Sequence, residues 1–162
     1  MYATNYVSPI GELLIVGDED AICGVWFKDQ KHFAATLNED LIFNEDLTIF
    51  KKVKNWFDDY FMGLNPEIDF ELKPRGTEFR LKVWEILTGI SYGETVTYGE
   101  IALKISETMS AQAVGGAVGA NPIAIIIPCH RVLGKDKRLT GYAAGLDKKK
   151  ELLRIEGINF KI

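Results

Sequence analysis

The sequence predicts an α+β fold. An antiparallel sheet with one helix comes first, and a helical C-terminal part with a helix-turn-helix follows. Three short runs of β-forming residues fill the first 30 residues, apolar residues then recur at helical spacing from Leu47 to Phe61, and helix-capping residues stand at Thr77, Thr97 and Ser110. The chain has 162 residues, of which 47% are hydrophobic and 26% charged, so it has the composition of a soluble globular protein with a substantial core.

The N-terminal part is expected to begin as a β-meander. Turn signals separate the runs of β-forming residues, which predicts strands at 2–7, 12–16 and 21–27. Residues 28–46 are polar and show no clear period. The helix that starts near Leu47 is expected to stop at Gly63, and one more strand is expected at 69–72.

A linker is expected at Lys73-Pro74-Arg75-Gly76, which divides the chain into an N-terminal domain at 1–73 and a second domain at 74–162. The charge changes sign nearby. Residues 1–70 hold 5 Lys/Arg and 13 Asp/Glu, whereas residues 71–162 hold 14 Lys/Arg and 10 Asp/Glu. A polyanion is therefore expected to bind the C-terminal part, although so small a basic excess fits a solvated surface equally well.

Three capping signals predict the C-terminal helices. Thr77 caps the first, Thr97-x-x-Glu100 is a capping box for the second, and Ser110 caps a third at 111–120. The short connection between the second and third helices predicts a helix-turn-helix. A last helix is expected at 146–156.

The helix expected at 111–120 contains three glycines, which together cost it roughly 2–3 kcal/mol relative to alanine. Such small residues permit a close approach of the backbone to something else. That partner is either another packed helix or a nucleic-acid groove, and the composition of this helix alone favours packing.

No membrane association is expected, because no apolar stretch approaches the roughly 20 residues that cross a bilayer, and the N-terminus lacks the pattern of a signal peptide. Cys23 and Cys129 show no disulfide spacing, which favours a reducing, cytoplasmic setting. Cys23 is expected to be a buried apolar residue.

The pentapeptide Pro128-Cys129-His130-Arg131-Val132 follows the apolar run 123–127 and places a thiol beside a base. Thiolate is the nucleophilic form of cysteine, and a neighbouring imidazole can generate it. This pentapeptide is therefore the first candidate for a catalytic site.

Several motifs in fixed order resemble one family, the O6-alkylguanine-DNA alkyltransferases, also called methylated-DNA–protein-cysteine methyltransferases. The resemblance covers about residues 60–157. The matching motifs are Tyr60-Phe61-x-Gly63, Gly76-Thr77-x-Phe79, Val83-Trp84, Tyr92-Gly93-Glu94-Thr95-x-x-Tyr98-Gly99-Glu100, Ala113-Val114-Gly115-Gly116-Ala117, Asn121-Pro122, Ile127-Pro128-Cys129-His130-Arg131-Val132 and Gly141-Tyr142.

The resemblance implies a ribonuclease-H-like N-terminal domain and a helix-turn-helix that enters the DNA minor groove. A monomer without cofactor would bind double-stranded DNA and flip O6-alkylguanine, with O4-alkylthymine as a second candidate substrate, into a pocket. Cys129 would take the alkyl group irreversibly, so each molecule would act once.

The resemblance also implies individual roles in catalysis. His130 would withdraw the thiol proton through a bridging water, and Glu156 would orient and charge-balance His130. Asn121 would hold the turn before the active-site segment, and Arg131 is expected to be scaffolding.

Further residues are implied in substrate and DNA binding. Tyr98 would contact the guanine, Tyr142 and Val118 would line the pocket, and small residues would permit groove contact. The backbone of Val132 and of the loop 142–145 would recognise the guanine edge. The DNA-contacting small residues are Ala113 and Gly115, and the loop includes Ala143.

The sequence departs from the family pattern at Gln112, where an arginine usually fills the gap left by the flipped base. Glutamine lacks the charge and stacking surface of arginine, which affects base flipping rather than the chemistry. Ala143-Ala144 replaces the usual Ser-Gly and is expected to narrow the pocket. No metal site is expected, because Cys23 and His32 are too few ligands for zinc.

Two other functions stay open at this stage. A damage sensor that binds without transfer is one, although relatives of that kind replace the cysteine that stands here at Cys129. A thiol hydrolase based on Cys129-His130 is the other, although the only further histidine is His32, in the acidic half.

Overall fold

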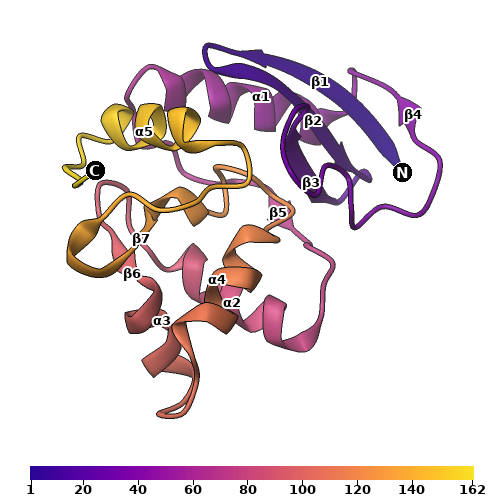
Figure 1. Ribbon diagram of the computed structural model, residues 1–162. Helices are drawn as coiled ribbons and strands as arrows, with labels where there is room; N and C mark the ends of the chain where they lie inside the picture. The colour runs from indigo at the N-terminus through magenta and orange to yellow at the C-terminus, as the bar shows by residue number, and fades with distance from the viewer.

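The computed structural model describes residues 1–162 as a sheet-and-helix half packed against a helical half (Figure 1). The strands β1 (Tyr2–Ser8), β2 (Gly11–Gly17) and β3 (Ala21–Phe27) form the predicted antiparallel meander. The shorter strands β4 (Ile42–Phe43) and β5 (Glu71–Leu72) run parallel to β1 and β3 at the two edges. The sheet order is β4-β1-β2-β3-β5.

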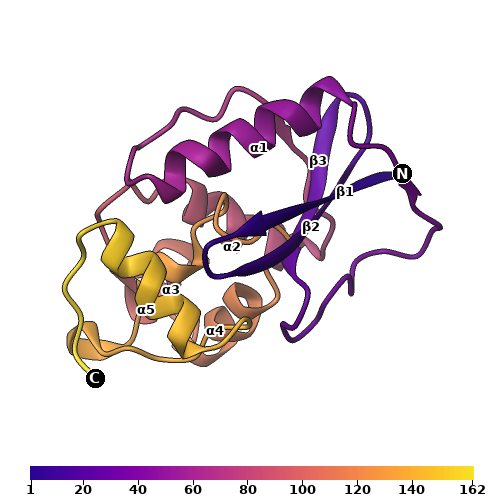
Figure 2. The same cartoon turned by 90° about the horizontal axis from the view of Figure 1, so that it is seen from above.

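Both faces of this sheet are covered. Helix α1 (Thr48–Phe61) packs its apolar stripe on one face, and Figure 2 shows it lying along the sheet. On the other face, Leu37 and Leu41 cover a small cluster that includes Trp26 and Cys23. The segment 28–46 has no period because most of it is an irregular cover of this face, in which only β4 is regular.

The predicted helix starts of the C-terminal half are confirmed. Thr77 accepts a hydrogen bond from Arg80 N and caps α2 (Glu78–Thr88), and the capping box at Thr97 opens α3 (Tyr98–Ile105). Ser110 caps α4 (Ala111–Gly119). The helices α3 and α4 are joined by a short turn, as expected for a helix-turn-helix, and α5 (Leu146–Ile155) is the last helix.

The segment that leads to the candidate nucleophile docks on the N-terminal sheet. Val25 N donates to Pro122 O at 2.8 Å and Ala124 N donates to Val25 O at 2.9 Å, which bridges Ile123 to β3. After a 3-10 turn, η1 (Cys129–Arg131), the chain forms β7 (Val132–Leu133), which pairs with β6 (Val96–Thr97). A second 3-10 turn, η2 (Lys135–Lys137), follows.

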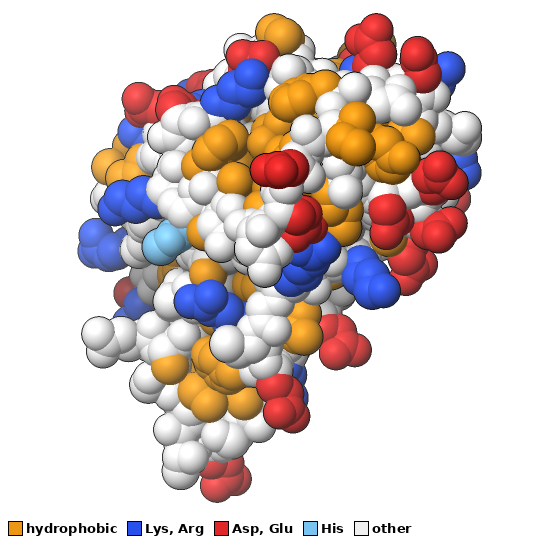
Figure 3. Space-filling view, turned by 90° about the vertical axis from the view of Figure 1, so that its right-hand side faces the viewer, with side chains coloured by type: hydrophobic (Ala, Val, Ile, Leu, Met, Phe, Trp, Pro, Cys, Tyr) orange, Lys and Arg blue, Asp and Glu red, His pale blue; other side chains and the backbone are white.

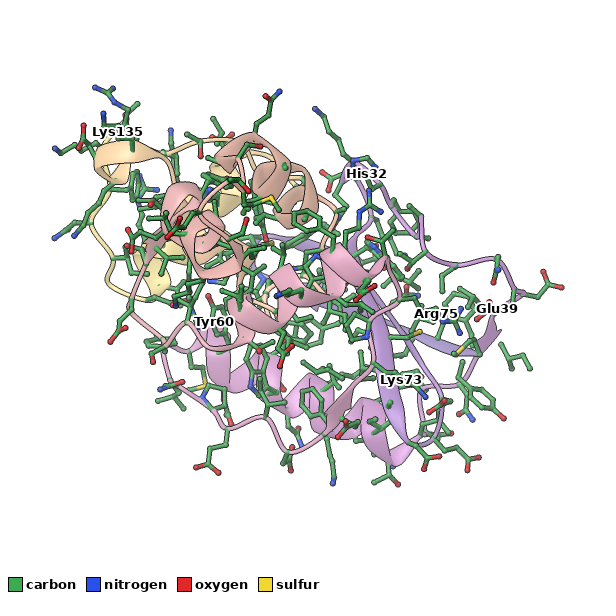
Figure 4. All side chains as sticks on the ribbon, turned by 90° about the horizontal axis from the view of Figure 1, so that it is seen from below. His32, Glu39, Tyr60, Lys73, Arg75 and Lys135 are labelled. Carbon is green, nitrogen blue, oxygen red and sulfur yellow. The ribbon has the colours of Figure 1, made fainter.

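The largest core cluster contains residues from both sides of the predicted boundary at 73/74. Arg75 of the linker also pairs with Glu39 at 2.8 Å, and Figure 4 shows the two side chains together. The two halves therefore share one packed core, and the division at 73/74 stays a prediction. None of the helices has the length and apolar character that crossing a membrane requires.

Candidate active site

Cys129, His130 and Arg131 lie together in the turn η1, and Asn121 holds the segment that precedes it. The Asn121 side-chain amide donates to Ile127 O at 2.8 Å and to Ile123 O at 3.2 Å, while its oxygen accepts from Ile123 N at 3.0 Å. One buried side chain thus replaces the backbone partners that a regular strand would supply. This arrangement agrees with the predicted structural role of Asn121.

His130 is joined to Glu156, which lies at the C-terminal end of α5. The two residues are 26 positions apart, yet His130 Nε2 lies 2.5 Å from Glu156 Oε2 and both side chains are fully buried. His130 and Glu156, which the family resemblance pairs, are therefore in contact in the structure.

Glu156 accepts three more hydrogen bonds. Tyr60 of α1 donates its hydroxyl proton to Oε2 at 2.7 Å, Arg131 Nε donates to Oε1 at 2.7 Å and Gly93 N donates to Oε1 at 3.0 Å. Arg131 also donates to Ile90 O at 2.6 Å, so the expected scaffolding role fits its contacts. Tyr60 was part of a sequence motif, but nothing in the pattern indicated that α1 of the other half reaches this carboxylate.

These contacts set the protonation states. Burial alone would raise the pKa of Glu156, but the hydrogen bonds from His130 and Arg131, together with the Arg131 charge, outweigh burial and hold the pKa below its ordinary value. Burial lowers the pKa of His130, and together with the charges of Arg131 and Lys149 it outweighs the Glu156 carboxylate, which raises this pKa, so the imidazole is neutral at pH 7. An ionised Glu156 can only accept, so the ring proton lies on Nε2.

The other ring nitrogen, His130 Nδ1, is buried and has no hydrogen-bond partner. With Nε2 protonated, Nδ1 carries a free lone pair. A buried acceptor without a partner costs free energy, and a functional role is one reason for a protein to keep one. A general base that removes the proton of the neighbouring Cys129 thiol needs such a lone pair.

Cys129 is 7% exposed, and burial raises the pKa of its thiol. The side chains of Asn121, Lys149 and Tyr142 act in the opposite direction but do not overcome burial. The resting state is thus a neutral thiol beside a neutral imidazole. A preformed thiolate, the simplest reading of a Cys-His pair, is not what this environment favours.

Lys149 of α5 is fully buried below this site, a feature that sequence reasoning missed. Its Nζ donates to Val132 O at 2.7 Å, to Thr140 O at 3.1 Å and to Gly141 O at 3.3 Å. Burial lowers its pKa to about 8. The ammonium therefore holds two segments of the site together.

A cavity of about 570 Å³ opens above Cys129. Seven of the predicted site residues line it: Tyr98, Gln112, Gly115, Val118, Cys129, Tyr142 and Ala143. Ala113 and Val132 do not. Ala113 is exposed beside the cavity on α4, and the Val132 carbonyl accepts from Lys149, which leaves it one further lone pair.

Polar groups in the cavity belong to a few residues. The Tyr142 hydroxyl is buried next to the Cys129 sulfur and has no oxygen or nitrogen partner. The Tyr98 hydroxyl accepts a hydrogen bond from Thr140 Oγ1 at 3.3 Å, so its own proton is free to be donated. Six of the lining residues are hydrophobic, and an apolar pocket with a few directed polar groups suits a flat heteroaromatic ring.

The three glycines of α4 face different surroundings. A Cβ on Gly115 would lie 3.8 Å from the Tyr98 ring, but a Cβ on Gly116 or Gly119 would meet nothing within 4 Å. The reading that these glycines serve close helix packing is therefore wrong for two of the three. Gly115 and Gly119 line the cavity, whereas Gly116 lies on an exposed, uncharged surface beside it.

No group of three or more His, Cys, Asp or Glu side chains is arranged to hold a metal ion. Cys23 is a buried free thiol, as expected.

Two family models match the chain. Residues 1–74 match "6-O-methylguanine DNA methyltransferase, ribonuclease-like domain", and residues 78–158 match "6-O-methylguanine DNA methyltransferase, DNA binding domain".

The chain is also similar to full-length relatives. It is 44% identical over 161 residues to the methylated-DNA–protein-cysteine methyltransferase of Haemophilus influenzae, covering 99% of this chain and 88% of that one. It is 45% identical to the protein of that name from Methanosarcina acetivorans, covering 97% and 99%. The crystal structure of Mycobacterium tuberculosis OGT in complex with DNA has a TM-score of 0.87 at 39% identity, covering 96% and 92%.

Proposed function

Because the chain belongs to the 6-O-methylguanine DNA methyltransferase family, we propose that it repairs DNA by direct reversal, moving the alkyl group of O6-alkylguanine to the Sγ of its own Cys129. It is thus a methylated-DNA–protein-cysteine methyltransferase. The observation that carries the assignment of the acceptor is the position of Cys129. Its thiol lines the cavity, and the next residue, His130, is bonded to an ionised carboxylate.

The first step is removal of the thiol proton. His130 Nδ1 accepts it through a bridging water, and the resulting imidazolium is stabilised by Glu156 at Nε2. Tyr60 and Arg131 keep Glu156 ionised and in place. Since burial raises the pKa of Cys129, the resting thiol is neutral, and this proton transfer belongs to the reaction rather than to the resting state.

The second step is an in-line displacement at the alkyl carbon. A bond forms between Sγ and that carbon as the bond from the carbon to guanine O6 breaks. The electron pair of the broken bond remains on the guanine, which takes up a proton and leaves as neutral guanine. Tyr98 can donate that proton because its hydroxyl accepts from Thr140. The Tyr98 phenolate then regains a proton as His130 gives up the one taken from the thiol, so that the thiol proton is balanced by the proton on guanine. The thioether on Cys129 is stable, so each molecule acts once.

The exposed surface of α4 supports docking of this helix in the minor groove of DNA, because Gly116 has no protein neighbour that would block close approach. The cavity beside α4 would then receive the flipped base. All the groups of the relay and of the cavity come from one chain, which supports action as a monomer. The acceptor must remain a reduced thiol, which is the argument for a cytoplasmic setting.

Intact-mass measurement tests this function. After mixing with duplex DNA that contains O6-methylguanine, the protein should gain one methylene, located by peptide mapping on the peptide with Cys129. The variant Cys129→Ser should bind the same DNA without any mass gain. Binding without transfer by the unsubstituted protein would indicate a damage sensor, and label on Cys23 or repeated turnover would contradict the proposal outright.

A further inference from the structure

We propose that Lys31 and His32, on the segment 28–41 between β3 and β4, bind the DNA phosphate that adjoins the flipped nucleotide. This inference rests on the proposed function. It assigns a DNA contact to the acidic N-terminal half, whereas the charge distribution predicts contacts in the C-terminal half alone.

The first observation is the charge around the cavity. Lys31 and His32 line it together with residues of α4 and the loop that follows η2, and Lys31 is the only Lys, Arg, Asp or Glu among the thirteen lining residues. Opposite them, α4 carries no charged residue at all, and position 112 is Gln. The one charged side chain that a nucleotide would meet in this cavity, Lys31, therefore comes from the N-terminal half.

The second observation is that the Lys31 ammonium has no partner. Neighbouring lysines are engaged: Lys28 pairs with Glu12 at 2.9 Å and Lys148 pairs with Asp29 at 2.7 Å. Lys31 makes no salt bridge and no side-chain hydrogen bond, and both Lys31 and His32 are exposed. Figure 3 shows basic side chains above the lower part of the molecule, formed by α3 and α4, where few charges are visible.

The third observation is that this segment is attached to the active-site loop. Lys31 N donates to Ala143 O at 3.0 Å, and Ala143 is itself a lining residue. The Gln30 side chain accepts from Phe27 N at 2.8 Å and so fixes the start of the segment. His32 has a φ of 59°, in the left-handed region, and Figure 4 shows it on the part of the segment near the C-terminal helices. The backbone of this segment is therefore held beside the cavity, and the exposed side chains of Lys31 and His32 extend from it.

The depth of the cavity determines which part of a nucleotide Lys31 and His32 can contact. Cys129 is buried at the base of the cavity, so the reacting guanine must lie deep, and its sugar and phosphates remain at the mouth. A lysine ammonium and an imidazole N–H both donate hydrogen bonds to phosphate oxygens. The partner is thus the backbone phosphate next to the lesion, rather than the base or the alkyl group.

The sharpest test compares small substrates that need no flipping. The protein should react with the 3′- or the 5′-monophosphate of O6-methyl-2′-deoxyguanosine about three- to tenfold faster than with the nucleoside, which has no phosphate. In Lys31→Gln this advantage should disappear while the nucleoside rate is unchanged. His32→Gly, which removes the ring but tolerates the left-handed backbone, should reduce the advantage in part.

A second measurement does not depend on transfer. The affinity for duplex DNA should fall less steeply with salt in Lys31→Gln, with a slope of log K against log salt smaller by about 0.9. Between 50 and 200 mM salt that is a difference of about 3.5-fold. Lys51→Gln is the matched control: Lys51 is an exposed lysine of α1 in the same half, without a salt bridge and away from the cavity. Lys31→Arg should restore both readouts.

The outcomes separate the two proposals. If the unsubstituted protein transfers alkyl groups but Lys31→Gln keeps the monophosphate advantage and the salt slope, the phosphate contact is overturned and the repair function stands. If Lys51→Gln changes the salt slope as much as Lys31→Gln, only net charge matters and the contact is again overturned. If no transfer occurs, the repair function fails, and the salt slope still decides whether Lys31 binds phosphate.

Discussion

Replacing Glu156 by glutamine tests the proton relay directly. The carboxylate accepts from His130 and Tyr60 on one oxygen and from Arg131 and Gly93 on the other. Glutamine has nearly the same shape but offers one acceptor oxygen and one NH₂ group. Whichever way the amide turns, its NH₂ faces a pair of donors on one side.

Both orientations damage the site. In either orientation glutamine is neutral, so the mostly buried Arg131 guanidinium loses its counter-charge, which costs about 3–5 kcal/mol of stability, and an NH₂ that faces Arg131 also places donor against donor. If the NH₂ faces His130, the imidazole must accept at Nε2, and its proton moves to Nδ1. The base that Cys129 needs is then lost, and loss of a general base slows a reaction by about 10²–10⁴-fold.

The pH dependence identifies the second effect. A thiol with a pKa near 8.5 is about 3% ionised at pH 7 and about 75% ionised at pH 9, which is roughly a 25-fold gain. Burial raises the pKa of Cys129, so without a base the gain approaches tenfold per pH unit. In the unsubstituted protein the neutral His130 already serves at pH 7, so Glu156→Gln should recover much of its deficit at pH 9.

Single-turnover transfer from free O6-methylguanine, followed by mass spectrometry between pH 7 and pH 9, measures this. Glu151→Gln, an exposed change on α5 that removes only a contact with Arg154, is the control and should behave like the unsubstituted protein. Thermal unfolding at each pH verifies that the variant is folded. A deficit of the same size at pH 7 and pH 9 would refute the relay and leave Glu156 a structural contact.

Three further variants follow from the structure. Gln112→Arg should speed repair of duplex DNA several-fold, on the order of 1 kcal/mol, because arginine adds a charge to the side chain that faces the gap left by the flipped base. Transfer from the free base should not change, and an equal effect on duplex DNA and on the free base would contradict this role. Gly116→Ala has room for its methyl group, so it should stabilise the protein to unfolding by about 1 kcal/mol yet weaken DNA binding, whereas unchanged binding would argue against groove contact by α4. Tyr60→Phe removes one hydrogen bond to Glu156 and should slow transfer from DNA and from the free base equally, as rate measurements on both substrates can verify; an effect on DNA alone would place Tyr60 in DNA binding instead.

The elements that the sequence predicted are those with local causes. The caps at Thr77, Thr97 and Ser110 act within three residues, and the apolar stripe of α1 lies within one helix. The strands that it missed, β4, β6 and β7, are two residues long and exist because a distant strand pairs with them. No local pattern encodes such pairing, and β-propensity over two residues carries little information.

The residues of the site also fall into two groups, those with a local sequence signal and those placed only by distant parts of the chain. Cys129 and His130 are adjacent in sequence, so a sequence motif identifies them, whereas Tyr60 contacts Glu156 across 96 positions. Lys149 stands in the run Lys148-Lys149-Lys150, which reads as a solvated helix face. Successive residues of a helix point about 100° apart, so Lys148 can pair with Asp29 outside while Lys149 points into the core. Only the docking of α5 decides which lysine is buried.

The raised pKa of Cys129 has a consequence for a protein that acts once. The thiolate fraction and the solvent exposure of a cysteine determine how fast it is oxidised, and both are low for the buried, neutral thiol of Cys129. The same burial would make Cys129 a poor nucleophile if no base stood beside it. His130 resolves this conflict, because burial keeps it neutral, Glu156 holds its Nδ1 free, and it can therefore take the thiol proton when Cys129 reacts. The buried relay thus keeps the thiol unreactive at rest without sacrificing its reaction with the lesion.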